Sequence, residues 1–284
     1  MTWREWLLEA TPFLNNTDAP RLGAELILTY ITGASRLDLI MAPNTALTEN
    51  QLAVAWQQAA RFAAGEPLAY LLKRKEFYGR EFSLNRATLI PRPDTECMLE
   101  YALNSLPKID INFADFGVGC GCIAVSLALE RPAWQGLGLD NNPEALAAAS
   151  YNSTLLGAEN LSFAQADFTR PETLTTLPLC AFSLDLLIAN PPYISQAEYD
   201  NLADNVRLYE PKAALVSGAS GLTHIMAIVA AAPDLLKPGG LLLIEHGATQ
   251  GDAVKNLCLP TIWKNVETGR DLAEQDRYLI AWRR

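Results

Sequence analysis

The 284-residue sequence contains no run of about 18 uninterrupted apolar residues, the minimum length for a membrane-spanning helix. Its first residues, MTWREWLLEATPFL, carry Arg4, Glu5 and Glu9 among apolar positions, so they indicate an amphipathic helix rather than a signal peptide. We therefore expect a cytoplasmic protein that does not bind membranes.

Patterns typical of metal sites and disulfide frameworks are also missing. The five cysteines are scattered, and the Cys120-Gly121-Cys122 triplet has no second cysteine pair or nearby histidine to complete a zinc site. An odd number of scattered cysteines does not suit a disulfide framework either. We expect no bound metal, and five reduced cysteines that act as small apolar side chains.

Basic residues are fewer than acidic ones, and the net charge is −10. Proteins that depend on phosphate contacts usually present a basic surface. Residues 71–80, LLKRKEFYGR, and Arg92 are the only candidates for a local basic patch, and a solvated linker is the simpler interpretation. The charge balance disfavours direct binding to bare nucleic acid.

Residues 1–75 contain helical patterns only. Thr2 with Glu5, and Thr48 with Gln51, match the capping-box signature of a helix start. Half of the whole sequence is hydrophobic, which suffices for a packed core. Because residues 1–75 hold no Gly-rich loop or catalytic cluster, we expect a small helical bundle that recognises the substrate.

Residues 76–95 change to short aromatic and β-branched stretches around Gly79, with Pro91 and Pro93 stiffening the exit. This segment predicts a β-hairpin linker between the helical bundle and the rest of the chain.

From residue 96 to residue 284, strand and helix patterns alternate, which is typical of an α/β domain with a doubly wound parallel sheet. Five expected strands cover residues 111–117, 136–140, 161–167, 183–190 and 241–247. Expected helices cover residues 122–130, 143–155 and 221–236, and residues 262–284 predict two further strands around a polar loop. The sheet is thus expected to have seven strands.

The segment 115–121, DFGVGCG, joins the first of these strands to a helix. Gly117, Gly119 and Gly121 allow a sharp turn and a close approach of the backbone to a ligand. Asp140 ends the next strand, near the roughly 20-residue spacing expected of a carboxylate that grips a ribose. A helix-capping aspartate is the alternative interpretation of Asp140.

The acidic residue that begins this loop indicates a cofactor with positive charge. A dinucleotide would place its pyrophosphate at the helix N-terminus, whereas S-adenosylmethionine carries a sulfonium and an ammonium and no phosphate. The third strand ends in the pair Asp167 and Phe168, which are expected to hold the adenine amino group and ring. The predicted cofactor site comprises Asp115, Gly117, Val118, Gly119, Cys120, Gly121, Asp140, Asp167, Phe168 and Asn190.

A buried strand pattern, LLIA, ends in Asn190-Pro191-Pro192-Tyr193. The Asn190 side-chain oxygen and the Pro191 carbonyl can accept the two hydrogens of a planar NH2 group, which turns the nitrogen lone pair toward a methyl donor. Tyr193 can lie flat against that group, and the prolines fix the geometry before the substrate arrives. We predict catalytic roles for Asn190, Pro191 and Tyr193, and substrate binding by the same three residues together with Pro192.

With the Gly loop, Asp140 and NPPY, the chain resembles class I S-adenosylmethionine-dependent methyltransferases that act on planar exocyclic nitrogens. Further stretches make it resemble the HemK/PrmC-type peptide chain release factor N5-glutamine methyltransferases over nearly its whole length: 65–79, GEPLAYLLKRKEFYG; 88–96, TLIPRPDTE; 206–215, VRLYEPKAAL; and 242–251, LLIEHGATQG. The resemblance implies methylation of the glutamine in the Gly-Gly-Gln loop of release factors, which act in translation termination. The chain departs from the family at Val118 and Cys120, where hydroxyl residues are more frequent, and at Phe168, where some relatives carry tryptophan.

Two alternatives remain at this point. A methyltransferase acting on an exocyclic amino group of a nucleic-acid base would also need residues that hold a planar NH2 group, with Tyr193 stacked on the base. We call residues 190–193 the clamp. A cofactor-binding scaffold would need no such clamp.

His246 is expected to act only through its neighbours, and His224 is interpreted as an ordinary helix residue. The protein is expected to be a monomer.

Overall fold

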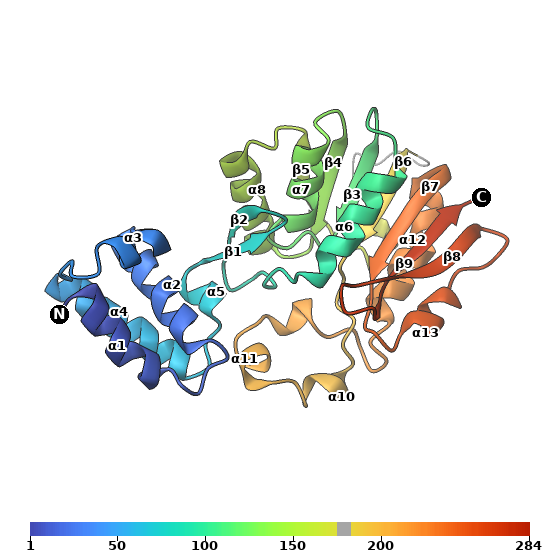
Figure 1. Cartoon of the computed structure of the whole chain (residues 1–284). Coiled ribbons are helices and arrows are strands. Elements are labelled where there is room, and N and C mark those ends of the chain that lie inside the picture. The colour runs from blue at the N-terminus through green and yellow to red at the C-terminus, as the bar shows by residue number, and fades with distance from the viewer. Residues whose placement is uncertain (175–182) are drawn as a thin grey trace. The chain divides into compact units, whose positions relative to one another are not determined.

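The computed structural model of the chain describes residues 1–174 and 183–284. It forms two compact units, whose elements are labelled in Figure 1. One unit comprises Met1–Arg74 and Ala203–Tyr209, and the other comprises Lys75–Leu202 and Glu210–Arg284. No helix in the described part of the chain is long and apolar enough to cross a membrane.

The first unit is a helical bundle. Its helices are α1 (Trp3–Phe13), α2 (Pro20–Thr32), α3 (Arg36–Met41), α4 (Glu49–Ala63), α5 (Leu68–Leu71) and α11 (Asp204–Arg207). The predicted capping boxes at Thr2 and Thr48 both form, so each satisfies two backbone N–H donors at a helix start. The core gathers around Trp6, whose fully buried ring lies 5.6 Å from the ring of Trp56.

The predicted hairpin consists of β1 (Arg74–Phe77) and β2 (Arg80–Ser83), which pair in a two-stranded sheet. Tyr78 and Gly79 form the turn with φ values of 49° and 71°, in the left-handed region that glycine adopts without steric cost. Helix α6 (Asp94–Ser105) follows, and the sequence reading missed it. Its first turn begins directly after Pro93, a position where proline is tolerated and where acidic residues such as Asp94 favour a helix start.

The second unit contains a seven-stranded sheet in the order β5-β4-β3-β6-β7-β9-β8. Its strands are β3 (Asn112–Phe116), β4 (Gln135–Asp140), β5 (Leu161–Gln165), β6 (Leu184–Ala189), β7 (Leu236–Glu245), β8 (Trp263–Arg270) and β9 (Asp276–Arg283). Strands β3 to β7 are parallel, as the alternation predicts, and β9 is antiparallel to both β7 and β8. The chain proceeds outward from β3 in one direction and from β6 in the other, so a crevice is expected at their carboxyl ends.

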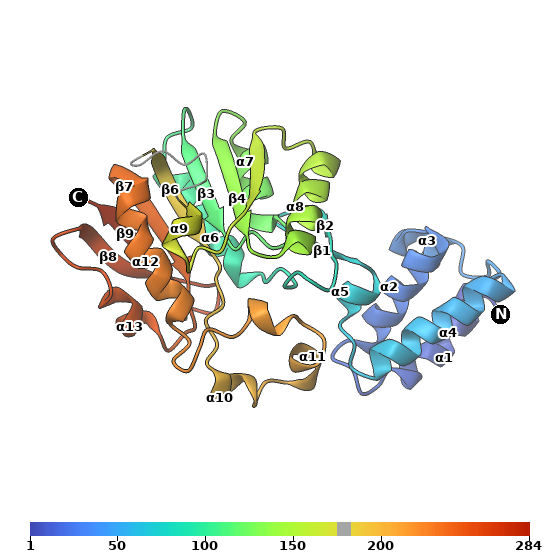
Figure 2. The ribbon, with the colours of Figure 1, turned by 180° about the vertical axis from the view of Figure 1, so that it is seen from behind.

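Helices cover both faces of this sheet, and Figures 1 and 2 show α6 and α12 on opposite sides of it. Helices α7 (Cys122–Glu130) and α8 (Pro143–Leu156) pack with α6 against one face. Helices α9 (Pro171–Leu174), α12 (Thr223–Leu235) and α13 (Gly251–Lys255) share one apolar core with the other face. The short elements α10 (Gln196–Tyr199) and η1 (Lys212–Ala214) lie between β6 and α12 in the chain.

One strand starts earlier than expected. Strand β7 begins at Leu236 rather than at residue 241, because Leu236 pairs with Leu184 across a register irregularity that accommodates Pro238 and Gly239.

Of the five cysteines, Cys180 lies outside the described residues, and the other four are free thiols: Cys97, Cys120, Cys122 and Cys258.

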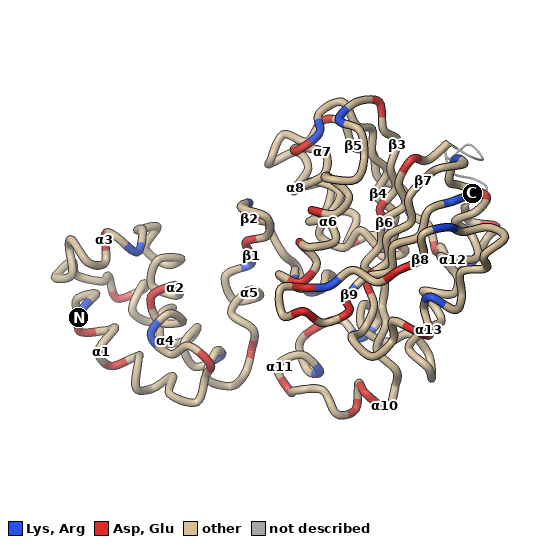
Figure 3. Tube along the Cα trace, turned by 45° about the vertical axis from the view of Figure 1, so that its right-hand side comes forward, with Lys and Arg blue, Asp and Glu red and all other residues tan. Residues whose placement is uncertain are grey.

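Acidic and basic residues are interspersed along the trace of both units (Figure 3). Two members of the candidate basic patch have acidic partners. Arg80 lies 2.6 Å from Glu130, and Arg92 forms an ion pair with the buried carboxylate of Glu210. Because these cations are partly neutralised, they offer less attraction for a polyanion than the sequence suggests.

Candidate active site

A cavity opens at the carboxyl ends of the parallel strands. It brings together a large part of the predicted site, namely Gly117, Gly119, Asp140, Asp167, Phe168, Asn190 and Pro192. Leu89 and Ala87 line it from the loop after β2, and Pro211, Ala213 and Ala214 line it from the segment around η1. The remaining predicted residues do not line it: Asp115, Val118, Cys120, Gly121, Pro191 and Tyr193. The roles of all the predicted site residues stay predictions.

The Gly loop requires its glycines. Gly117, Gly119 and Gly121 have φ values of 79°, 56° and 85°, all in the left-handed region. A Cβ on Gly121 would lie 3.2 Å from Ala149 of α8, so this glycine also allows close helix packing. A Cβ on Gly117 would lie 3.8 Å from the Phe168 ring and 4.0 Å from the Asn190 carbonyl oxygen, between two residues that line the cavity.

Asp140 links the Gly loop to the start of α8. Its Oδ2 accepts from the Gly119 amide at 3.0 Å, and its Oδ1 accepts from the Asn142 amide at 2.9 Å. Burial raises the pKa of Asp140, while these backbone hydrogen bonds oppose the shift. The capping of α8 itself comes from Asn142, whose Oδ1 accepts from the Glu144 amide. Asp140 therefore supports local structure and still presents carboxylate oxygens at the cavity.

An aromatic group forms the wall beyond the loop. The Phe168 ring stacks on Phe116 with centroids 5.6 Å apart, and it meets the His224 ring edge-on at 5.9 Å. His224 lines the cavity, although the sequence reading treated it as an ordinary helix residue. It lies in the first turn of α12, where Ser217 Oγ contacts its Nδ1 at 2.7 Å and burial lowers its pKa. No sequence motif surrounds His224, so only the fold identifies it.

The NPPY segment follows β6, which pairs with the Gly-loop strand β3. Asn190 Nδ2 donates to Thr95 Oγ1 at 3.2 Å, which leaves the amide oxygen on the opposite side of the amide group. Tyr193 donates its hydroxyl to Glu245 at 3.2 Å, and its carbonyl accepts from Gln250 at 2.9 Å. The asparagine and the tyrosine are thus both fixed by side chains from other elements.

Two residues in this region were not identified from the sequence. Thr95 is the second residue of α6 and Glu245 ends β7, and the Thr95 hydroxyl donates to the Glu245 carboxylate at 2.6 Å. His246 is fully buried, its Nδ1 lies 2.9 Å from the Gly247 carbonyl oxygen, and it does not line the cavity.

The loop before α6 is held against the segment that follows α11. The buried Glu210 carboxylate pairs with Arg92 and accepts from the Ile90 amide at 3.2 Å. Leu89 precedes Ile90 and Pro211 follows Glu210 in the chain, and both line the cavity. The ion pair between Arg92 and Glu210 therefore stabilises one wall of the site. Removing one partner of such a pair leaves a buried charge uncompensated.

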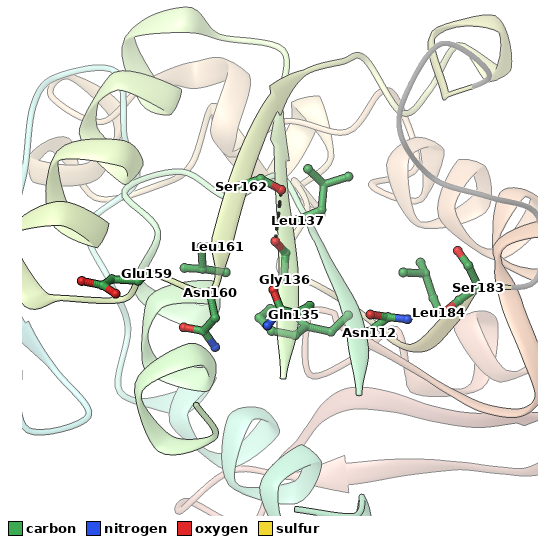
Figure 4. Close-up of a pocket in the computed structure, with 11 residues that line it drawn as sticks. Asn112, Gln135, Gly136, Leu137, Glu159, Asn160, Leu161, Ser162, Ser183 and Leu184 are labelled. Carbon is green, nitrogen blue, oxygen red and sulfur yellow. Dashed lines mark hydrogen bonds between the residues drawn. The ribbon is translucent and has the colours of Figure 1, made fainter. Parts of the chain in front are cut away.

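A second cavity lies at the opposite, amino-terminal ends of the strands (Figure 4). It is larger, at about 440 Å³ against about 120 Å³, and its lining includes Asn112, Gln135, Asn160 and Ser162. None of the predicted site residues lines it. Ligands of doubly wound sheets bind at the carboxyl ends of strands, so the smaller cavity is the candidate active site.

Comparison with known proteins shows the family of the chain. A family described as the PrmC N-terminal domain matches residues 5–72, and the methyltransferase small domain matches residues 98–221. The release factor glutamine methyltransferase of Nitratidesulfovibrio vulgaris is 46% identical to this chain, covering 94% of it and 89% of the relative. The release factor glutamine methyltransferase of Escherichia coli is 35% identical to this chain, and the match covers 99% of this chain and 98% of the relative. The chain belongs to the release factor glutamine methyltransferase family.

The family assignment agrees with the fold. A methyltransferase from Pyrococcus furiosus has a solved structure that matches with a TM-score of 0.52 at 14% identity, covering 80% of this chain and 98% of that one. The predicted α/β methyltransferase fold, the family and S-adenosylmethionine as the cofactor are therefore confirmed.

The residues present fit that cofactor. Asp115 is buried against the start of α7, where its Oδ2 accepts from the Ala124 amide at 3.2 Å. Its Oδ1 is buried and has no hydrogen-bond partner within the described residues, and burial raises its pKa to about 7. A cationic ligand near the loop would favour the ionised form of this carboxyl. Together with the glycine cradle and Asp140, Asp115 provides an environment suited to a cationic nucleoside.

Replacement of Asp140 by alanine is expected to weaken S-adenosylmethionine binding about tenfold or more. The reason is the loss of charge-assisted hydrogen bonds to the ribose, each worth roughly 1.5–3 kcal/mol. Calorimetric titration measures this change. The matched control is Asp185→Asn, because Asp185 also accepts from a backbone amide, that of Asn112 at 2.9 Å, but lines neither cavity. Equal affinities in the Asp140 variant and wild type would remove Asp140 from the cofactor site.

Proposed function

We propose that this chain methylates the side-chain amide nitrogen of the glutamine in the Gly-Gly-Gln loop of peptide chain release factors. The observation that carries the proposal is the position of Asn190, which lines the same cavity as the Gly loop at the carboxyl ends of neighbouring strands. The curated relatives named above support glutamine as the acceptor class. A release factor substrate also assigns the reaction to the cytoplasm.

The clamp residues account for the chemistry. An amide nitrogen is a poor nucleophile because its lone pair is conjugated with the carbonyl group. The Asn190 oxygen and the Pro191 carbonyl accept its two hydrogens and stabilise a more tetrahedral nitrogen. Tyr193 packs against the amide plane, and Pro192 restricts the backbone so that this geometry exists before the acceptor binds.

The transfer requires no dedicated base. When bound, S-adenosylmethionine supplies a methyl group activated by the adjacent sulfonium. A carbon–nitrogen bond forms as the carbon–sulfur bond breaks, and the nitrogen then releases one proton to water. Asn190 and Pro191 hold that proton in a hydrogen bond until transfer is complete, which is consistent with the absence of any histidine from the clamp.

The direct test is transfer of a tritiated methyl group into purified release factor, compared with DNA and ribosomal RNA as acceptors. We expect incorporation into the release factor only, at the glutamine of its Gly-Gly-Gln loop, as located by peptide mass spectrometry. Incorporation into either nucleic acid in preference to the protein would overturn the proposal and favour the base-modifying alternative.

We further propose that the helical unit contacts the release factor and that the enzyme acts as a monomer without binding nucleic acid directly. The unit carries an apolar groove bordered by Leu8 and Ile40, which are 65% and 73% exposed, with Arg4 and Arg21 at its rim. Exposed apolar side chains gathered in one groove are typical of a protein-binding surface.

Replacement of Ile40 by aspartate is expected to raise the KM for release factor about tenfold, because an apolar contact of roughly 1.5 kcal/mol is lost. The kcat and the affinity for S-adenosylmethionine are expected to remain unchanged. Steady-state kinetics with intact release factor measures the effect, and Leu272→Asp is the control because Leu272 is 85% exposed in the other unit. An unchanged KM for the Ile40 variant would exclude this groove as the docking surface.

A further inference from the structure

Four side chains from three segments form a continuous hydrogen-bonded network: Asn190 and Tyr193 after β6, Thr95 in α6 and Glu245 at the end of β7. Asn190 Nδ2 donates to Thr95 Oγ1 at 3.2 Å, and the Thr95 hydroxyl donates to Glu245 Oε2 at 2.6 Å. The other carboxylate oxygen of Glu245 accepts from the Tyr193 hydroxyl at 3.2 Å. Thr95 and Glu245 are 2% and 1% exposed, so water does not compete for these bonds.

The chemistry of the network fixes its direction. An ionised carboxylate only accepts hydrogen bonds, so Thr95 must donate its single proton to Glu245. The Thr95 oxygen can then only accept from its second neighbour. Asn190 must therefore turn its NH2 group toward Thr95, which directs its carbonyl oxygen away from Thr95. The oxygen and nitrogen of an asparagine amide usually have to be assigned from their hydrogen-bond partners. Here the negative charge of Glu245 determines the assignment at Asn190, through the Thr95 hydroxyl that lies between them.

We propose that Thr95 and Glu245 are positioning residues that orient both clamp side chains, the Asn190 amide with its oxygen toward the acceptor and Tyr193 through its hydroxyl. This inference rests on the proposed methyl transfer for its kinetic consequences. Neither positioning residue touches the acceptor, and both act through the direction of the hydrogen bonds. The network explains why a buried carboxylate lies beside the clamp.

The ionisation state of Glu245 controls this direction. Burial raises its pKa to about 7, against the opposing effects of the Thr95 hydrogen bond and the Arg277 charge. Three charged side chains act on this network: Asp94 on α6 and Arg277 on β9 act on Glu245, and Arg92 acts on Tyr193. A protonated Glu245 can donate to Thr95, which frees the threonine to donate to a flipped Asn190 oxygen and removes the acceptor from the substrate. We expect kcat to fall as the pH decreases through about 7.

The first experiment compares Thr95→Val with Thr95→Ser in the full-length enzyme. Valine keeps the shape and removes the hydroxyl, whereas serine keeps the hydroxyl. We expect the valine variant to lose about tenfold in kcat at unchanged KM and unchanged S-adenosylmethionine affinity, and the serine variant to retain near-wild-type kcat. Equal kcat values for wild type and the valine variant would overturn the inference, as would equal losses in both variants.

The second experiment reverses the direction of the network. In Asn190→Asp the new carboxylate oxygen faces a threonine whose proton is already donated to Glu245, so the bond to Thr95 is lost. Adding Glu245→Gln supplies an NH2 group that donates to Thr95, which can then donate to the new carboxylate. We expect the double variant to have a kcat at least tenfold above that of the single Asn190→Asp variant. A double variant no faster than the single one contradicts the proposed direction.

A measurement without any methyl acceptor separates this inference from the proposed function. In nuclear magnetic resonance spectra, the side-chain NH2 signals of Asn190, assigned by their loss in Asn190→Ala, are expected to shift with pH through about 7 in wild type. They are expected not to titrate in Glu245→Gln. Signals that respond identically in both proteins would refute the network, whereas a wild-type enzyme inactive on release factor, with the titration intact, would refute only the proposed acceptor.

Discussion

Replacement of Asn190 by alanine is expected to slow single-turnover methyl transfer by about 10²–10³-fold. This corresponds to about 2.7–4 kcal/mol, the typical effect of removing one preorganised group that stabilises a transition state. The variant loses the acceptor for the substrate NH2 group and the donor to Thr95. Its fold and its affinity for S-adenosylmethionine are expected to change much less, because Pro191 and Pro192 still end the strand. Rapid-quench kinetics and calorimetric titration provide the two measurements.

Asn190→Asp serves as the matched variant, since it preserves size and acceptor oxygens, replaces the NH2 donor by a second oxygen and adds a negative charge. Its rate is expected to lie between those of wild type and alanine, provided that the acceptor contributes more than the donor. A near-wild-type rate for alanine would mean that the motif only terminates β6. The single-turnover regime matters because product release can mask a slower chemical step.

Sequence reasoning located the segments that line the cavity and are local in the chain. The Gly loop is a single turn between β3 and α7, and its glycines are required by positive φ values that any reader of the motif can anticipate. The NPPY segment is similarly compact, and its place after a buried strand indicates the carboxyl edge of the sheet. In both cases the backbone conformation and the chemistry are encoded in the same few residues.

The missed parts depend on long-range contacts. Thr95 and Asn190 are 95 positions apart, and Thr95 and Glu245 are 150 positions apart, so no periodic pattern relates them. Thr95 lies in the stretch 88–96 that carries the family resemblance. The sequence does not predict helix α6, which orients Thr95, because Pro91 and Pro93 precede it. His224 reaches the cavity only because α12 begins beside Phe168. Sheet order brings these residues together, and the sequence alone does not specify which side chains then meet.

Replacement of Gly117 by valine is expected to weaken S-adenosylmethionine binding about a hundredfold. Gly117 has a φ of 79°, and its missing Cβ would point between Phe168 and the Asn190 carbonyl oxygen, where no protein atom lies closer than 3.8 Å. The protein therefore has room for the added Cβ, and we expect the two methyl groups beyond it to occupy space that the cofactor needs. Inserting such groups into a filled site typically costs about 1–3 kcal/mol, and the upper part of this range corresponds to the expected loss.

The matched control for Gly117→Val is Gly157→Val at the end of α8, because Gly157 also has a φ of 79° and no atom within 4 Å of its missing Cβ. Both variants place a β-branched residue in the left-handed region, which costs roughly 1–2 kcal/mol of folding free energy. We therefore expect denaturant unfolding to show similar destabilisation in the two proteins, while calorimetry shows weakened cofactor binding for Gly117→Val alone. Equal cofactor affinities would mean that the loop does not approach the cofactor, and equal losses in both variants would assign the effect to general destabilisation instead of steric exclusion.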